Sequence, residues 1–257
     1  MTVPIETSGA IALVGSGEYL PQMFEVDRHL IATVGGPEQT HAVLIPTASA
    51  LEPGMPQRWN TLGLAHFQLL DVAAVPLLIL QRDDASVPEV IDELRRANFF
   101  YFSGGNPHQI IDTWRDTPAW EVLTTRRSQG AVIAGCSAGA MMMGGVTISI
   151  RRAIGGALEW LPGLGVVPEL AILPHFDRMR QRFSTEQFST VLRTTPPGIT
   201  VVGVDEDTAL VRIGTEWQVM GLQGVSVFDS DGAETRYMTG DSVPLPHSRG
   251  GDSFSGG

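Results

Sequence analysis

The chain has 257 residues, 43% of them apolar, with one cysteine and a formal net charge of −11. This length and composition suffice for one domain with a full core. The negative charge argues against a nucleic-acid or anionic-membrane partner, and a single cysteine excludes an internal disulfide or a cysteine-based zinc cluster. All 17 basic residues are arginine, so Schiff-base chemistry, a phosphate-loop lysine and a Ser–Lys dyad are excluded.

Targeting and metal signals are absent from the sequence. No apolar run approaches the length of a membrane span, and the first residues lack the charged and apolar regions of a secretory signal. We therefore expect a cytoplasmic protein without a membrane partner. No metal-ligand spacing occurs, and we expect neither a metal nor another cofactor.

The first half of the chain alternates apolar runs with amphipathic segments. The apolar runs predict buried parallel strands at 10–14, 42–45, 75–80, 99–102 and 131–134. Helical patterns separate them at 23–34, about 56–70, 87–97 and 119–129. This order predicts an α/β fold, a doubly wound and mostly parallel sheet with helices on both faces. Functional loops should then gather at the carboxyl ends of the strands.

The second half of the chain has shorter apolar runs, most of them separated by turns instead of helical segments. A short strand at 171–173 precedes a helix over about 176–192, and four strands follow at 200–204, 209–213, 217–220 and 224–228. Turns such as Asp231-Gly232 indicate a small antiparallel extension toward the C-terminus. We see no linker, so we expect residues 1–248 to form a single domain and the Gly/Ser-rich residues 249–257 to form a flexible tail.

Residues 135–139 read Gly-Cys-Ser-Ala-Gly, a G-x-S-x-G pattern between an apolar run and a helical segment. A nucleophile elbow requires this order of strand, sharp turn and helix, because the turn lifts one side chain above the sheet beside a helix N-terminus. We therefore predict that Ser137 is a nucleophile. Cys136 precedes the apex of the turn and is expected to be a small buried residue.

A nucleophilic serine needs a base and an acid that orients the base. Among the six histidines, which are His29, His41, His66, His108, His175 and His247, we favour His175, since it ends a strand where functional loops gather. For the acid we favour Glu206 over Asp205, in a cluster of three carboxylates after the next strand. An α/β-hydrolase places its acid between serine and histidine, which here would require His247 in the tail, so we reject that fold.

Other candidates surround this triad. The backbone N–H groups of Ala138 and Gly105 could form an oxyanion hole. Arg178 and Arg182 share a helix face and could hold a substrate carboxylate, although a solvated basic face is equally compatible. The Gly15-Ser16-Gly17 loop lacks the third glycine of a dinucleotide site, because Leu20 occupies that position.

In their order along the chain, these segments resemble peptidase family S51, which includes aspartyl dipeptidase (peptidase E) and cyanophycinase. The family has a fold like that of class I glutamine amidotransferases. The resemblance extends over the segments Gly15-Ser16-Gly17-Glu18, Ile45-Pro46-Thr47-Ala48-Ser49, Phe102-Ser103-Gly104-Gly105-Asn106, Gly135-Cys136-Ser137-Ala138-Gly139-Ala140, Pro174-His175-Phe176 and Val204-Asp205-Glu206-Asp207-Thr208-Ala209.

The resemblance implies Ser137 as nucleophile, His175 as base and a carboxylate near Glu206 as the third member, with Glu159 as a weaker fallback. It also places Asn106 near the substrate. Pro174 and Asn106-Pro107 depart from cyanophycinase-like sequences, which carry Gln before the histidine and Asp-Gln after the paired glycines. These departures leave the substrate open.

We therefore expect a serine peptidase that cleaves short peptides or isopeptides, with an aspartyl residue on the acyl side, through an acyl-enzyme. Its partner is a small peptide, and a homodimer is a compatible assembly. The first alternative is a non-catalytic relative that binds a small acidic ligand in the same pocket. The second is a glutamine amidotransferase-like subunit, which would carry cysteine at the apex of the elbow.

Overall fold

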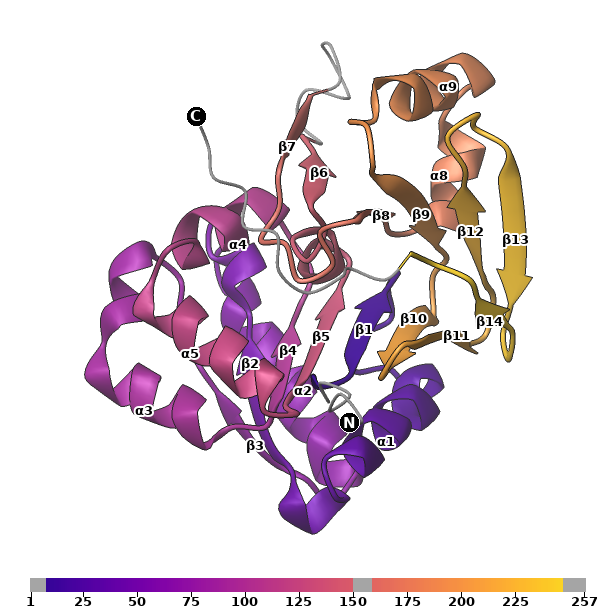
Figure 1. The fold of residues 1–257 in the computed structure, drawn as a ribbon. Helices are drawn as coiled ribbons and strands as arrows, with labels where there is room; N and C mark the ends of the chain where they lie inside the picture. The colour runs from indigo at the N-terminus through magenta and orange to yellow at the C-terminus, as the bar shows by residue number, and fades with distance from the viewer. Residues whose placement is uncertain (1–7, 150–158, 247–257) are drawn as a thin grey trace, which may run out of the picture.

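The computed structural model describes residues 8–149 and 159–246, which form a large sheet with flanking helices and a smaller sheet beside it (Figure 1). In the large sheet β3, β2, β4, β5 and β1 are parallel neighbours, and β10, β11 and β14 continue antiparallel from β1. In spatial order its strands are β14 (Ser242–Val243), β11 (Glu216–Gly221), β10 (Thr208–Ile213), β1 (Ile11–Val14), β5 (Val132–Cys136), β4 (Phe99–Phe102), β2 (His41–Ile45) and β3 (Ala73–Pro76).

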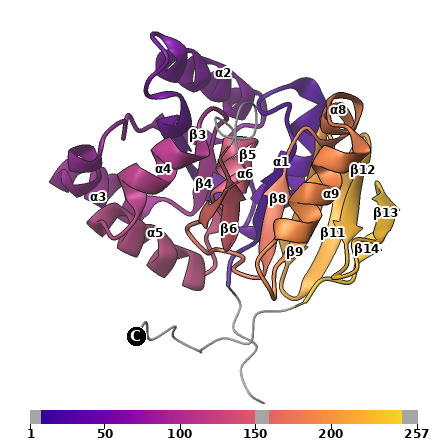
Figure 2. The ribbon, with the colours of Figure 1, turned by 90° about the horizontal axis from the view of Figure 1, so that it is seen from above.

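Helices cover both faces of this sheet, with α2 on one side and α5 on the other (Figure 2). Successive strand residues point to opposite faces, so Tyr101 packs with α1 and α2, whereas Phe100 packs with α3, α4 and α5. The helices are α1 (Phe24–Thr33), α2 (Met55–Leu69), α3 (Pro88–Arg96), α4 (Pro107–Trp114) and α5 (Pro118–Ser128). The doubly wound, mostly parallel α/β fold is thus confirmed.

The smaller sheet, shown in orange and yellow in Figure 1, contains two of the strands expected toward the C-terminus, those at 200–204 and 224–228. The other two, expected at 209–213 and 217–220, correspond to β10 and β11 of the large sheet. The order of the smaller sheet is β13-β12-β9-β8, with β8 and β9 parallel and the other pairs antiparallel. The elements of this part are β8 (Leu170–Leu173), β9 (Thr200–Val204), β12 (Gly224–Phe228), β13 (Glu234–Met238), α8 (Phe176–Arg182) and α9 (Thr185–Thr194). A third apolar cluster packs β8, β9 and β12 against α8 and α9.

Several elements differ from the expectations. Strand β3 occupies Ala73–Pro76 rather than 75–80. The helix expected over 176–192 is two helices, because Ser184 starts α9 with a capping box in which its side chain and that of Gln187 accept each other's backbone N–H groups. Helix α4 and the hairpin of β6 (Val146–Ile148) and β7 (Trp160–Pro162) were not expected.

The expected domain bounds and the expected tail depend on residues at the ends of the chain. The predicted tail at 249–257 and His247 lie outside the described residues, and the single domain over residues 1–248 stays a prediction. Within residues 8–149 and 159–246, no helix is long and apolar enough to cross a membrane.

Candidate active site

The carboxyl end of β1 holds together three segments that are far apart in the sequence. The Val14 carbonyl accepts the Ser137 N–H at 2.9 Å, and the Gly15 carbonyl accepts the His175 N–H at 3.3 Å. The Gly15 N–H in turn donates to the Thr208 carbonyl at 2.9 Å. The backbone of one central strand therefore fixes the relative positions of the predicted nucleophile, the predicted base and the acidic turn.

Ser137 stands at a sharp turn between β5 and the short helix α6 (Ala138–Met141). Its φ of 52° and ψ of −110° are rarely adopted by residues with a side chain, which indicates local strain. Two glycines make this turn sterically possible. A Cβ on Gly135 would lie 2.3 Å from the Gly139 carbonyl oxygen, and one on Gly139 would lie 2.4 Å from the Phe102 carbonyl oxygen. The turn has the geometry of a nucleophile elbow.

His175 lies between Ser137 and Glu206. Its Nε2 is 3.1 Å from Ser137 Oγ, and its Nδ1 is 2.8 Å from Glu206 Oε1. The histidine lies two residues after the end of β8, in a left-handed backbone conformation with φ 49° and ψ 38°. The structure thus brings these three residues into one hydrogen-bonded chain, in which a serine proton can pass to an imidazole that a carboxylate orients.

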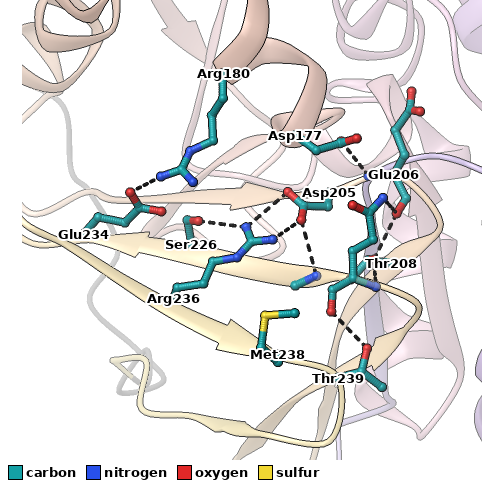
Figure 3. A network of polar contacts seen from close by, with 12 residues as sticks. Asp177, Arg180, Asp205, Glu206, Thr208, Ser226, Glu234, Arg236, Met238 and Thr239 are labelled. Atoms are coloured by element: carbon teal, nitrogen blue, oxygen red, sulfur yellow. Dashed lines mark hydrogen bonds and ion pairs between the residues drawn. The ribbon is translucent and has the colours of Figure 1, made fainter.

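Helix α8 also holds Glu206 in place. The Glu206 N–H donates to Asp177 Oδ1 at 3.0 Å (Figure 3), and Arg178 Nε contacts Glu206 Oε2 at 2.6 Å. The Glu206 side chain is 15% exposed. Each of its two carboxylate oxygens therefore has its own partner, His175 on one and Arg178 on the other.

The neighbouring carboxylate, Asp205, faces a different set of partners (Figure 3). Its side chain is fully buried and pairs through both oxygens with Arg236, while the Gly224 N–H donates to Asp205 Oδ2 at 3.3 Å. Arg236 also donates to Ser226 Oγ at 3.0 Å. These contacts hold in place the start of the turn that carries Glu206. Glu159, the other alternative, directly follows the undescribed residues 150–158.

The loop that carries Gly105 approaches the elbow, since a Cβ on the preceding Gly104 would lie 3.3 Å from Ser137 Cβ. The N–H groups of Ala138 and Gly105 pair with no acceptor among the described residues. Gly105 has a φ of +143°, and a Cβ there would lie 2.4 Å from the Ala48 carbonyl oxygen, so no other residue fits without strain. Two unpaired N–H groups beside a nucleophile can stabilise a developing oxyanion.

Glu18 is a residue whose role the sequence did not predict. It is buried, its Oε1 accepts the Gly104 N–H at 2.9 Å, and its Oε2 accepts the Cys136 thiol at 2.8 Å. It thereby ties the glycine loop after β4 to the last residue before Ser137. Burial, together with the nearby Glu18, raises the pKa of the Cys136 thiol well above its usual range, so Cys136 is the small buried residue that was expected.

Ser137, His175 and Glu206 line a cavity of about 630 Å³ that Arg178 and Arg182 also line. In the described part of the chain, Arg182 has no hydrogen-bond or ion-pair partner.

Asn106, which the resemblance places near the substrate, is not among the residues that line the cavity. Its Oδ1 caps α4 by accepting the His108 N–H at 3.0 Å. No group of three or more His, Cys, Asp or Glu in residues 8–149 and 159–246 is placed to hold a metal ion.

The chain is similar to known proteins in sequence and in fold. Residues 11–220 match the family model described as Peptidase family S51. The chain is 27% identical over 175 residues to an uncharacterized peptidase, YgaJ, of Bacillus subtilis, covering 67% of this chain and 70% of that protein.

Two solved structures are also similar. The crystal structure of a peptidase from an acI-B1 Actinobacterium is 31% identical, with a TM-score of 0.82 over 93% of this chain and 98% of that one. A putative peptidase E protein from Listeria monocytogenes EGD-e is 19% identical, with a TM-score of 0.61 over 83% of this chain and 98% of that one, and shares the fold.

Proposed function

Because the chain belongs to peptidase family S51 and is a serine-type peptidase, we propose that it hydrolyses short peptides or isopeptides through Ser137, His175 and Glu206. The observation that carries this proposal is the continuous chain of contacts from Ser137 Oγ through the two ring nitrogens of His175 to Glu206 Oε1, at 3.1 and 2.8 Å. In a Ser–His–acid hydrolase the nucleophile, the base and the orienting acid are connected in this order.

The chemistry follows from these contacts. Ser137 Oγ attacks the carbonyl carbon of the scissile amide while its proton moves to His175 Nε2, and Glu206 stabilises the imidazolium through Nδ1–H. The N–H groups of Ala138 and Gly105 bind the resulting oxyanion. His175 then gives the proton to the leaving nitrogen, the C–N bond breaks, and an ester on Ser137 remains. Water attacks this ester with His175 again as base, releasing the acid and restoring the serine hydroxyl.

We further propose an aspartyl residue on the acyl side, joined by an α- or β-linkage, and a cytoplasmic location. The motifs of the chain support the aspartyl preference, because they resemble those of a family that includes aspartyl dipeptidases.

The test is hydrolysis of a panel of short α- and β-aspartyl peptides by the wild-type protein and by Ser137→Ala. We expect turnover by the wild type and a loss of about 10⁴-fold or more in the variant, with thermal unfolding of both proteins showing that they are folded. Equal turnover in both proteins would refute Ser137 as nucleophile. Binding of acidic peptides without turnover in either protein would favour the non-catalytic relative.

A further inference from the structure

The cavity beside Ser137 has walls that an acidic substrate alone does not explain. Half of the residues that line the cavity have apolar side chains. They are Met141, Ile148, Leu173, Pro174, Met179 and Phe183. A volume of about 630 Å³ is in the range of sites that hold small organic ligands.

The floor of the cavity is continuous with the third apolar core. Met141, Ile148 and Leu173 are only 2%, 5% and 1% exposed, and they belong to the same cluster as the fully buried Phe176. Met179 packs against that cluster from α8. A charged side chain placed on this floor would lose its hydration without finding a partner, whereas an apolar side chain would gain from burial.

The position of the cavity indicates which part of the substrate it holds. His175 hands its proton to the leaving nitrogen, so the leaving residue must lie on the His175 side of the nucleophile. The cavity is lined by His175 and by Pro174 just before it in the sequence, but Gly105 and Ala138, which bind the oxyanion, are not among its lining residues. It therefore lies on the leaving side of the scissile bond.

The two arginines at the cavity indicate where the carboxylate of the leaving residue would bind. Arg178 is engaged with Glu206, whereas Arg182, one turn further along α8, has no partner in the described part of the chain. A leaving residue at the end of a peptide carries a free carboxylate, which suits a single exposed guanidinium at the edge of an apolar pocket.

We propose that this cavity is the subsite for the leaving residue, and that it selects a C-terminal amino acid with an apolar side chain and a free carboxylate. The apolar walls receive the side chain and Arg182 receives the carboxylate. This inference rests on the proposed peptidase function and adds the substrate class on the leaving side.

The test compares kcat/KM for dipeptides that share an N-terminal aspartate and end in leucine, glycine, aspartate or leucine amide. We expect the leucine peptide to exceed the glycine peptide by about 10-fold or more, and the aspartate and amide peptides to be poorer than the leucine peptide. Met179→Ser should reduce the leucine-to-glycine ratio, and Arg182→Gln should reduce the difference between leucine and leucine amide. Arg180→Gln is the matched control, since Arg180 is on the same helix but pairs with Glu234, and it should keep both ratios.

The outcomes separate this inference from the proposed function. Ser137-dependent hydrolysis with equal rates for the leucine and glycine peptides overturns the inference alone. If no peptide is hydrolysed, the proposed function fails, and calorimetric titration of the same dipeptides into Ser137→Ala decides the subsite. Tighter binding of the leucine peptide supports it, and equal binding of the leucine and glycine peptides overturns it.

Discussion

Arg178 donates from Nε to Glu206 Oε2 at 2.6 Å, on the carboxylate oxygen that His175 does not use. The sequence offers Arg178 and Arg182 as candidates to hold a substrate carboxylate, with a solvated basic face as an equally compatible interpretation. In the structure the nearest acid to Arg178 is the protein's own Glu206. The Arg178 side chain is 59% exposed, so solvent screens this pair and its effect on overall stability is small. Its main consequence is to restrict the orientation of Glu206.

We therefore expect Arg178→Gln to lower kcat about 10-fold, the effect of losing about one charge-assisted hydrogen bond, with little change in KM. Steady-state kinetics on the best aspartyl peptide separates the two parameters, and Arg180→Gln provides the control for charge on the same helix. A large rise in KM with kcat unchanged would show instead that Arg178 binds the substrate.

The two neighbouring acids should respond in opposite ways to loss of charge. Glu206→Gln should lower kcat by about 10³–10⁴-fold, because the imidazole loses its orienting carboxylate, and should leave the melting temperature nearly unchanged. Asp205→Asn should destabilise the fold by about 3 kcal/mol or more, because it leaves Arg236 without the carboxylate it faces.

Thermal unfolding and kinetics below the melting temperature measure both effects. A stable but inactive Asp205→Asn protein, together with an active Glu206→Gln protein, would reverse the assignment of the acid.

Glu18 should act on catalysis through the glycine loop. Glu18→Ala removes the acceptor of the Gly104 N–H and should allow the adjacent Gly105 N–H to leave the oxyanion position. We expect kcat to fall about 10- to 100-fold, less than the loss of a whole oxyanion donor, with KM little changed. Glu18→Gln keeps an oxygen acceptor and should recover most of the rate. If both variants lose activity only in proportion to lost stability, Glu18 has a structural role alone.

Much of this site could be predicted from the sequence because its residues follow strands. Ser137 and His175 each stand within a few residues of the end of a short apolar run, and in an α/β fold such positions meet at one edge of the sheet. The G-x-S-x-G pattern adds a local steric requirement that can be read without a structure. The mostly parallel sheet was predictable for the same reason, since its strands are continuous apolar runs.

The partners of these residues could not be predicted in the same way. Arg236 meets Asp205 across 31 positions of the chain, and Glu18 meets Cys136 across 118. No local pattern specifies such pairs, because the tertiary fold alone brings them together. The break between α8 and α9 was missed for a different reason. The apolar periodicity continues past Ser184 and so predicts one helix, whereas the capping box at Ser184 starts a second helix there.

Cys136 should be unreactive despite lying next to the nucleophile. Burial raises the pKa of its thiol, so at about pH 8 the thiolate fraction lies below that of a free cysteine. We expect a thiol reagent such as iodoacetamide to label the denatured protein but not the native one, and peptidase activity to survive the treatment. Rapid labelling of the native protein with parallel loss of activity would contradict this expectation.

The raised pKa of the Cys136 thiol also makes the stability of the protein depend on pH. A pKa raised in the folded state means that the native protein holds its proton where the unfolded chain releases it, so stability falls as the pH rises past the usual thiol pKa. Cys136→Ala removes this titration. The difference in melting temperature between wild type and Cys136→Ala should therefore shrink between about pH 7 and about pH 10, and a constant difference would contradict the buried, protonated thiol.

In the proposed mechanism Ser137, His175 and Glu206 act as one unit. The most direct measurement is kcat for Ser137→Ala, His175→Ala and the double variant on the best peptide of the panel, with all three proteins shown to be folded. If the residues form a triad, either single substitution removes the same pathway, and the double variant is about as active as each single variant. If the two losses multiply in the double variant, the residues act independently, and the triad mechanism is wrong.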